Sequence, residues 1–205
     1  MSRVAASNQN ASRVDWSAMA DTNTHDAFVS DLHTAVAGAA SEKEILARVK
    51  PLAVRLAASD DLRARVTRQC DAEQGFGFQL LHEEADHALA VALFNWLPGR
   101  GTPAHDHGTW GVVVGVEGDE VNTFWQRVDD GARDGHAELR KLAEKRFVPG
   151  DAIVLPSTVI HSVWNDTDQV SVSLHVYGRH INHTGRSQFD PEAQTVRPWI
   201  VRQTE

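Results

Sequence analysis

The chain of 205 residues has little cysteine, no excess of positive charge and no long apolar run. Cys70 is its only cysteine, so no disulfide can form within the chain, which fits a reducing compartment. The net charge of −8 and the scattered arginines argue against a nucleic-acid partner or an anionic membrane. No apolar run approaches the roughly 20 residues of a membrane span, and the polar stretch 1–14 lacks the core of a signal peptide. We therefore expect a cytoplasmic protein with no nucleic-acid and no membrane partner.

The composition is that of an ordinary globular protein, with 41% hydrophobic and 23% charged residues. A chain of this length suits one domain that buries roughly 70% of its surface. Residues 1–22 are rich in Ala, Ser, Asn and Asp and predict a flexible tail with a short contact at Trp16. Residues 23–205 are expected to form a single domain.

A helical segment is predicted over residues 23–70. The apolar positions of its first helix recur four residues apart, at Phe28, Leu32 and Val36. Ser41 and Glu44 have the spacing of a capping box, so a second helix begins there. Pro51 falls inside that helix and predicts a kink or two short helices. A third helix is expected over 61–70.

Short apolar or alternating segments bounded by Gly, Asp and Pro fill residues 71–178 and predict strands. These segments are 76–81, 88–96, 111–116, 122–128, 138–147, 152–155, 161–165 and 170–177, of which 138–145 is also compatible with a helix. Many short strands at regular spacing indicate a sandwich or barrel. The remaining polar stretch, 179–205, is expected to wrap back over the barrel. The predicted fold is thus mainly β, a barrel preceded by about three helices.

The stretch 99–118 carries His105 and His107 after a turn rich in Gly and Pro and before an apolar run. Residues two apart in a strand point to the same side, so both imidazoles can aim at one point. Imidazole is the commonest side-chain metal ligand.

The spacing in this stretch resembles the first signature of the cupin family. Gly99 is followed after five residues by His105 and His107, and Gly118 closes the motif. Gly111 stands where that signature has a glutamate.

A second stretch resembles the second cupin signature. Gly150 leads to Pro156, then His161 and Asn165 follow at the family's spacing, with Thr158 in place of a glycine. The two resemblances, in the right order, imply a cupin fold, a double-stranded β-helix of the jelly-roll kind. His161 opens a strand and can reach the point at which the first two histidines aim.

Without the glutamate the expected metal site has three neutral imidazoles. A metal held in this way keeps positions open for other ligands. Asp106 lies between the two histidines and faces away from the metal if the segment is a strand. It either supports an imidazole N–H or serves as a surface or turn carboxylate.

A third motif places three polar residues, Ser173, His175 and Tyr177, on one face of a strand. If that face lines the barrel, a hydrogen-bonded row fixes the tautomer of His175 and the direction of the tyrosine hydroxyl. Taken alone, the pattern also fits a half-exposed strand.

The three-histidine cupin pattern together with Ser-x-His-x-Tyr resembles the thiol dioxygenases of the cysteine dioxygenase family. The stretch 103–107 and Trp110-Gly111 belong to the same resemblance, which places Trp110 near the metal. The resemblance implies one Fe(II) per chain, bound by His105, His107 and His161. It also implies a small thiol carboxylate and O₂ as partners and a sulfinic acid as product.

Substrate preference is implied by finer points of the same resemblance. The cysteine that cross-links to the barrel tyrosine in mammalian-type enzymes corresponds to Gly111, and their early arginine corresponds to Gln79. This resembles a bacterial subgroup that oxidises 3-mercaptopropionate and binds the carboxylate through an arginine after the tyrosine, here Arg186, with Arg179 as the rival. Gln79 is expected to help hold the substrate.

Several alternatives remain open at this stage. The thiol could be cysteine, or mercaptosuccinate with Arg179 as a second anchor. The protein could instead be a non-catalytic cupin that binds a metal or a small acid as a sensor. The sequence leaves the oligomeric state open.

Overall fold

The computed structural model describes residues 24–204, so the predicted tail over 1–22 and Trp16 lie outside the described part. Three helices come first: α1 (His25–Ala37), α2 (Glu42–Ala57) and α3 (Asp60–Arg65). The strands of the first half are β1 (Phe76–Glu83), β2 (Ala88–Trp96), β3 (Arg100–Gly101), β4 (Ala104–His105), β5 (Gly111–Glu117) and β6 (Glu120–Arg127). Those of the second half are β7 (Leu139–Phe147), β8 (Ala152–Leu155), β9 (Ile160–Asn165), β10 (Ser171–Arg179), β11 (Ser187–Asp190) and β12 (Thr195–Pro198).

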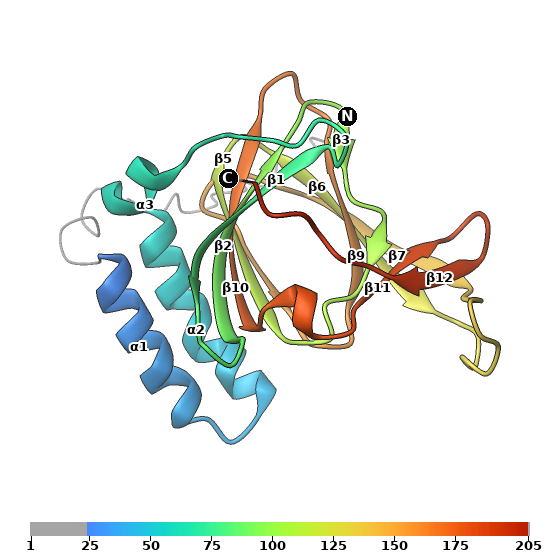
Figure 1. Cartoon of the computed structure of the whole chain (residues 1–205), viewed down its shortest axis with the longest axis horizontal. Coiled ribbons are helices and arrows are strands. Elements are labelled where there is room, and N and C mark those ends of the chain that lie inside the picture. Colours follow the sequence, from blue (N-terminus) through green and yellow to red (C-terminus); the bar gives the residue numbers. More distant parts are fainter. Residues whose placement is uncertain (1–23, 205) are drawn as a thin grey trace, which may run out of the picture.

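The strands form two antiparallel sheets that face each other (Figure 1). One sheet has the order β1-β2-β10-β5-β8, and the other follows β12-β11-β4-β9-β6-β7 with β3 paired to β9. Because β4 to β10 pass from sheet to sheet along the chain, the sheets wind together as a double-stranded β-helix. The expected cupin-type, mainly β fold with three preceding helices is confirmed.

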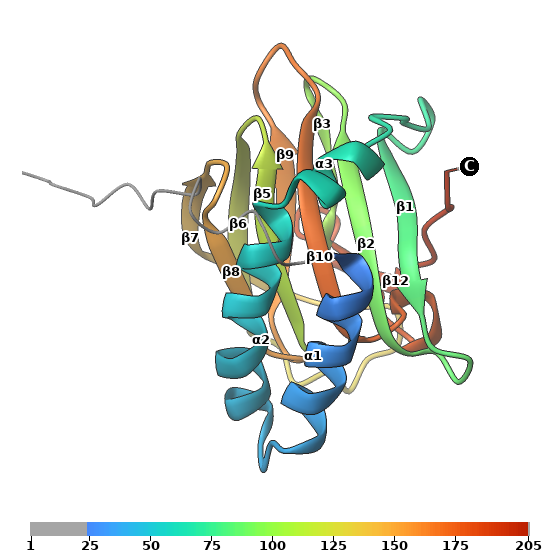
Figure 2. The same ribbon diagram turned by 90° about the vertical axis from the view of Figure 1, so that its left-hand side faces the viewer.

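The helices cover the outer face of the first sheet, as Figure 2 shows. One apolar core joins α1 and α2 to the outward side chains of β2, β5 and β10, among them Leu93, Val114 and Leu174. The opposite side chains of this sheet, such as Phe78, Phe94 and Tyr177, form a second core inside the barrel. The parity of each strand therefore decides whether a side chain meets the helices or the interior.

The helical segment differs from the sequence prediction in two places. α2 runs unbroken through Pro51, whose side chain is exposed, so of the two expected outcomes the pair of short helices is wrong. The third helix ends at Arg65 instead of residue 70. Val66 has extended backbone, and Arg68 has a positive φ of 54°, which no helix continues through.

The end of the chain is more regular than the predicted wrap. β11 and β12 form a hairpin, and β11 pairs with β4, which carries the first histidine. The ambiguous stretch 138–145 belongs to strand β7, which pairs with β6 along its whole length. Among the described helices, none combines the length and apolarity that crossing a bilayer requires.

Candidate metal centre

Three buried histidines meet between neighbouring strands of the second sheet. His105 on β4 pairs directly with His161 on β9, and His107 follows in the turn after β4. The ring centroids lie 4.6 Å apart for His105 and His161, 4.9 Å for His105 and His107, and 5.0 Å for His107 and His161. One ligand nitrogen from each ring lies within 4.8 Å of the others. His107 lies outside the strand, yet its side chain reaches the same point.

The hydrogen bonds of these rings leave nitrogens free for a metal. His105 Nδ1 lies 3.0 Å from the Pro103 carbonyl oxygen, and His161 Nδ1 lies 2.9 Å from Asn122 Oδ1. Both acceptors require an N–H at Nδ1, so Nε2 carries a lone pair in each ring. His161 Nε2 and His107 Nδ1 are buried without a hydrogen-bond partner among the described residues. Three neutral nitrogen donors with such orphaned atoms fit a first-row divalent metal.

The electrostatics keep these rings in the form that binds metals. Burial lowers the pKa of His105 and His107 well below the ordinary value, and the neighbouring histidines and the Arg186 charge lower it further. Burial and Arg186 lower the pKa of His161 to about 3. The imidazoles are therefore neutral at physiological pH, and no proton has to leave before a metal binds.

Two other His/Glu groups near the β1–β2 hairpin differ from this centre. His33 Nε2 and His82 Nε2 lie 2.8 Å and 2.9 Å from the same oxygen of Glu84, and His87 Nδ1 lies 2.6 Å from Glu83 Oε1. Each group is partly exposed, and in His33, His82 and His87 a hydrogen bond to a carboxylate occupies one ring nitrogen. Of the three candidate groups in the described part of the chain, only this one is fully buried, the centre of His105, His107 and His161, and it includes two ring nitrogens without a hydrogen-bond partner.

Ser173, His175 and Tyr177 on β10 form a hydrogen-bonded row inside the barrel. Ser173 Oγ lies 2.9 Å from His175 Nε2, and His175 Nδ1 lies 2.6 Å from the Tyr177 hydroxyl. The Tyr177 ring centroid lies 5.2 Å from that of His107, so the row ends at the metal centre. Gly111 pairs with Tyr177 across β5 and β10, and a Cβ there would lie 3.0 Å from Tyr177 Cδ1. The tyrosine ring therefore occupies the space that a side chain at Gly111 would need.

Arg186 is a buried cation beside the same centre, 3% exposed. Its Cζ lies 4.0 Å from the centroid of the Trp199 ring, and that ring lies 4.8 Å from the His105 ring. Its Nε has no hydrogen-bond partner among the described residues. Burial lowers the pKa of the guanidinium to about 10, so it stays charged at neutral pH. A buried charge without a hydrogen-bonded partner is costly, and an anionic ligand would remove that cost.

Asp106 does not support an imidazole. Its Oδ1 accepts a hydrogen bond from the Ser187 backbone N–H at 2.8 Å, and its own N–H donates to the Ser187 carbonyl oxygen at 3.2 Å. It is thus a turn carboxylate that fixes the backbone directly after Arg186.

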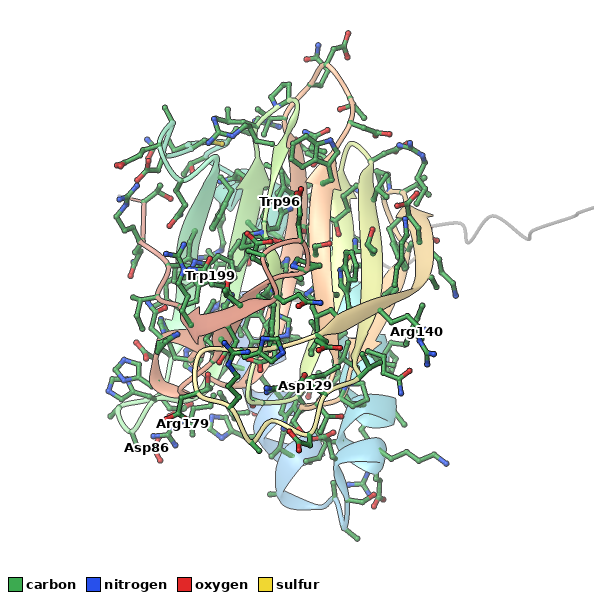
Figure 3. All side chains as sticks on the ribbon, turned by 90° about the vertical axis from the view of Figure 1, so that its right-hand side faces the viewer. Asp86, Trp96, Asp129, Arg140, Arg179 and Trp199 are labelled. Atoms are coloured by element: carbon green, nitrogen blue, oxygen red, sulfur yellow. The ribbon has the colours of Figure 1, made fainter. Side chains whose placement is uncertain are left out.

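The structure does not bring Gln79 or Arg179 to the centre. Gln79 Nε2 donates to the Arg65 carbonyl oxygen at 2.8 Å, and Thr67 donates to Gln79 Oε1 at 3.2 Å, on the face of β1 opposite Phe78. The parity of β1 turns Gln79 toward the segment after α3, so its position gives no support to the expected contact with substrate. Arg179 is exposed near the β1–β2 turn, where its Nε donates to the His183 carbonyl oxygen at 3.0 Å (Figure 3).

The tryptophan expected near the metal is also a different one. Trp110 packs in the core beneath the helices, on the outer side of the sheet. Trp199, in the stretch expected to be irregular, contacts both Arg186 and His105. Two further residues that the sequence did not predict here, Glu120 and Asn122, are linked to the centre by hydrogen bonds. Their signal is a pair of polar residues on one face of a strand that leads into the core.

Comparisons with known proteins found solved structures that are similar to part of this chain. No protein-family model matches the chain. A DMSP lyase, DddQ from Ruegeria pomeroyi DSS-3, is similar over 60% of this chain and 56% of its own, at 20% identity and a TM-score of 0.44. An oxalate oxidase in complex with glycolate is similar over 54% of each chain, at 14% identity and a TM-score of 0.43. A cupin superfamily protein from Desulfitobacterium hafniense DCB-2 is similar over 51% of this chain and 78% of its own, at 17% identity and a TM-score of 0.37. The chain thus spans about half the length of the oxalate oxidase.

Proposed function

We propose that the protein is an Fe(II)-dependent thiol dioxygenase that converts a small thiol carboxylate, preferably 3-mercaptopropionate, into a sulfinic acid. The observation that carries the proposal is a buried arginine, Arg186, with an unpartnered Nε beside three neutral histidines. The centre thus offers one place for an anion and one for a metal. The row that ends at Tyr177 adds a hydroxyl at the same place.

Arg186 binds the substrate carboxylate in this proposal. A guanidinium grips a carboxylate through two parallel hydrogen bonds, and the stack on Trp199 holds its plane. Asp106 stays on the Ser187 backbone, so it does not compete for the guanidinium. The anchor therefore selects an anionic end group.

The charges around the centre favour a monocarboxylate without an amine. The fixed charge beside the histidines is the cation of Arg186, which repels the α-ammonium group of cysteine. A second carboxylate, as in mercaptosuccinate, would need a second cation, and Arg179 lies at the β1–β2 turn. 3-Mercaptopropionate meets both conditions.

His105, His107 and His161 would hold the metal, and an iron ion there supplies affinity for thiolate and O₂ together with the redox chemistry that joins them. Tyr177, fixed by His175, provides a hydroxyl that can exchange a proton with the bound substrate. Burial raises the pKa of Tyr177, so the phenol stays protonated at rest. The chain thus contributes an anchor, a ligand set and a proton-exchanging group.

The proposal is tested by loading the protein anaerobically with Fe(II) and measuring O₂ uptake and sulfinate formation. The substrates are 3-mercaptopropionate, cysteine and mercaptosuccinate at equal concentrations. We expect one O₂ consumed per sulfinate and the highest kcat/KM for 3-mercaptopropionate. Faster oxidation of cysteine would overturn the substrate preference. Metal binding without oxidation of any of the three thiols would show a non-catalytic cupin.

A further inference from the structure

A buried carboxyl group lies behind the metal centre, at the start of β6. Glu120 is 4% exposed. Its Oε1 accepts a hydrogen bond from Asn122 Nδ2 at 3.2 Å, and its Oε2 lies 3.2 Å from Ser173 Oγ. A carboxyl group is rarely buried this deeply unless it is paired with other polar groups or belongs to a functional site.

These hydrogen bonds join the metal centre to the tyrosine row. On one side, Asn122 Oδ1 accepts from His161 Nδ1 at 2.9 Å. On the other side, the hydrogen bonds continue from Ser173 through His175 to the Tyr177 hydroxyl. Glu120 therefore lies in the middle of one chain of contacts that begins at His161 of the candidate metal centre and ends at the Tyr177 hydroxyl.

The Ser173 hydroxyl has one hydrogen, which it can donate either to Glu120 or to His175. The row of hydrogen bonds can therefore run in either of two directions. Trp96 Nε1 donates to Ser173 Oγ at 3.1 Å, which occupies one lone pair (Trp96 is labelled in Figure 3). When Glu120 is ionised, Ser173 donates to it, His175 Nε2–H donates to Ser173, and Tyr177 donates to His175 Nδ1. When Glu120 is protonated, it donates to Ser173, Ser173 donates to His175 Nε2, and His175 Nδ1–H donates to the Tyr177 oxygen. In both states every hydrogen on Glu120, Ser173 and His175 that belongs to this row has an acceptor within it.

The two directions differ at the end of the chain. In the ionised state the proton of Tyr177 points to His175, so the phenolic oxygen offers a lone pair to the substrate. In the protonated state the hydroxyl proton points to the substrate. The Tyr177 hydroxyl is therefore a hydrogen-bond acceptor toward the substrate in the ionised state and a donor in the protonated state.

This inference deepens the proposed thiol oxidation and rests on it. We propose that Glu120 holds the proton that the substrate thiol gives up, received through Tyr177, His175 and Ser173. Glu120 does not touch the substrate and acts through the tyrosine hydroxyl.

The transfer balances atom by atom. The S–H bond of the thiol breaks, and a new O–H bond forms on Tyr177, whose former proton moves to His175 Nδ1. The Nε2 proton of His175 moves to Ser173 Oγ, and the Ser173 proton moves to Glu120 Oε2. No electrons are exchanged, and the products are a thiolate and a neutral carboxylic acid.

The environment of Glu120 suits this task. Burial raises its pKa to about 7, although the hydrogen bonds from Asn122 and Ser173 oppose the rise. A group with this pKa can take up and release a proton near neutral pH. The titratable groups that approach it are His175 and Tyr177 on β10 and, beyond Asn122, His161 on β9. Arg186 acts on the same three groups from the far side of the centre.

The first test measures the protonation of Glu120 directly, in protein without metal or substrate. Infrared difference spectra between about pH 6 and about pH 8 should show the loss of a carboxylic acid carbonyl band, with a midpoint near neutral pH. The band should be absent in Glu120→Gln and present in Asp119→Asn. The latter variant removes the neighbouring, partly exposed carboxyl that faces Arg146. A band that persists in Glu120→Gln, or no band in the wild type, would overturn the inference.

The second test uses the pH profile of thiol oxidation. The rate in the wild type should rise with pH through the midpoint of the infrared band, because only the ionised carboxylate accepts a proton. Glu120→Gln should lose this rise and lower kcat about a hundredfold with little change in KM. The amide introduced by this substitution keeps the contact to Asn122 through its oxygen and donates to Ser173 through its nitrogen, so it fixes the protonated direction at every pH.

A double variant separates a role through Tyr177 from a merely structural role. In the Tyr177→Phe background, Glu120→Gln should cause no further loss of kcat, because the chain is already interrupted. Additive losses, or an unchanged pH profile in Glu120→Gln, would overturn the inference. If the infrared band behaves as expected and no thiol is oxidised, the proposed function fails separately, and the role of Glu120 as an acceptor of thiol protons fails with it.

Discussion

At the scale of single residues, Arg186 has the clearest functional signature. Its burial, its stack on Trp199 and its unpartnered Nε describe a charge that the folded chain keeps without a hydrogen-bonded partner. Such a charge lowers stability unless a ligand completes it. The cost is consistent with a binding site and hard to reconcile with a structural role.

Arg186→Ala should raise KM for 3-mercaptopropionate about tenfold to a hundredfold, because a charge-assisted hydrogen-bonded pair is worth about 1.5–3 kcal/mol. Steady-state O₂ uptake measures this change, and the metal content should stay that of the wild type. KM for a thiol alcohol of the same length, which has no carboxylate, should hardly change. Arg179→Ala is the matched control. An equal rise in KM for both thiols would remove Arg186 from the carboxylate site.

Asn122 makes a second prediction at this scale. Its Oδ1 fixes the Nδ1–H tautomer of His161, so Asn122→Ala should weaken metal binding about tenfold to a hundredfold. Competition with a chelator measures the dissociation constant. Ser162→Ala is the control, because Ser162 neighbours His161 but accepts a hydrogen bond from Trp125. Equal affinities for wild type and Asn122→Ala would show that His161 needs no such support.

At the scale of elements, the centre depends on strands that approach each other closely. Gly101 on β3 lies against β9, where a Cβ would come within 1.9 Å of the Val163 carbonyl oxygen. β9 carries His161, so this contact and the metal centre share one strand. The backbones of β3 and β9 therefore lie so close together that residue 101 has no room for a side chain.

Gly101→Ala should lower the free energy of unfolding by about 1–3 kcal/mol, because the two backbones must move apart. Urea denaturation measures the loss. Gly38→Ala is a suitable comparison, since the nearest atom to its new Cβ is the end of the flexible Arg48 side chain. An unchanged midpoint in Gly101→Ala would mean that β3 and β9 separate without cost.

The longer strands, and the four-residue β8, could be predicted from the sequence, whereas the two-residue strands could not. Strands such as 88–96 and 170–177 are indicated by local composition, and the structure contains β2 and β10 there. β3 and β4 have two residues each and exist because of partners about sixty residues away. Pro51 shows the reverse case, since tertiary packing keeps α2 continuous where local propensity predicts a break.

At the scale of the whole molecule, the site was predictable where its residues share a strand or a motif. Ser173, His175 and Tyr177 follow from a period of two, and the three histidines follow from motif spacing. Trp199 comes to the site only through the closure of the barrel, which leaves no local signal. Gln79 lies away from the centre for a simpler reason. Its neighbours on β1, Phe76 and Phe78, face the interior of the barrel, so alternation along the strand puts Gln79 on the other face.

The buried histidines predict the pH dependence of stability in the metal-free protein. Burial lowers the pKa of four histidines, His105, His107, His161 and His175. Below about pH 6.5 these side chains are therefore protonated in the unfolded chain but stay neutral in the folded chain. Stability should therefore fall as the pH drops. Glu120 has the opposite sign, because its raised pKa lets the folded state bind a proton between about pH 7 and about pH 4.5.

Four histidines outweigh one carboxyl, so the net excess in the unfolded state is roughly three protons, or roughly 4 kcal/mol per pH unit near pH 5.5. Urea midpoints between about pH 8 and about pH 5 should show a steep loss on the acid side. A flat profile across this range would contradict the burial of neutral histidines.

The pairing of β4 with β11 has a consequence for the length of the substrate. His105 pairs with Gln188, and Asp106 holds Ser187 from both sides, so the backbone that carries Arg186 is tied to the strand that carries a metal ligand. If the proposed function is correct, strand register therefore fixes the distance between the metal, which would bind the sulfur, and Arg186, which would bind the carboxylate. Thiol acids that are one methylene shorter or longer do not match this distance, so they should be oxidised more slowly.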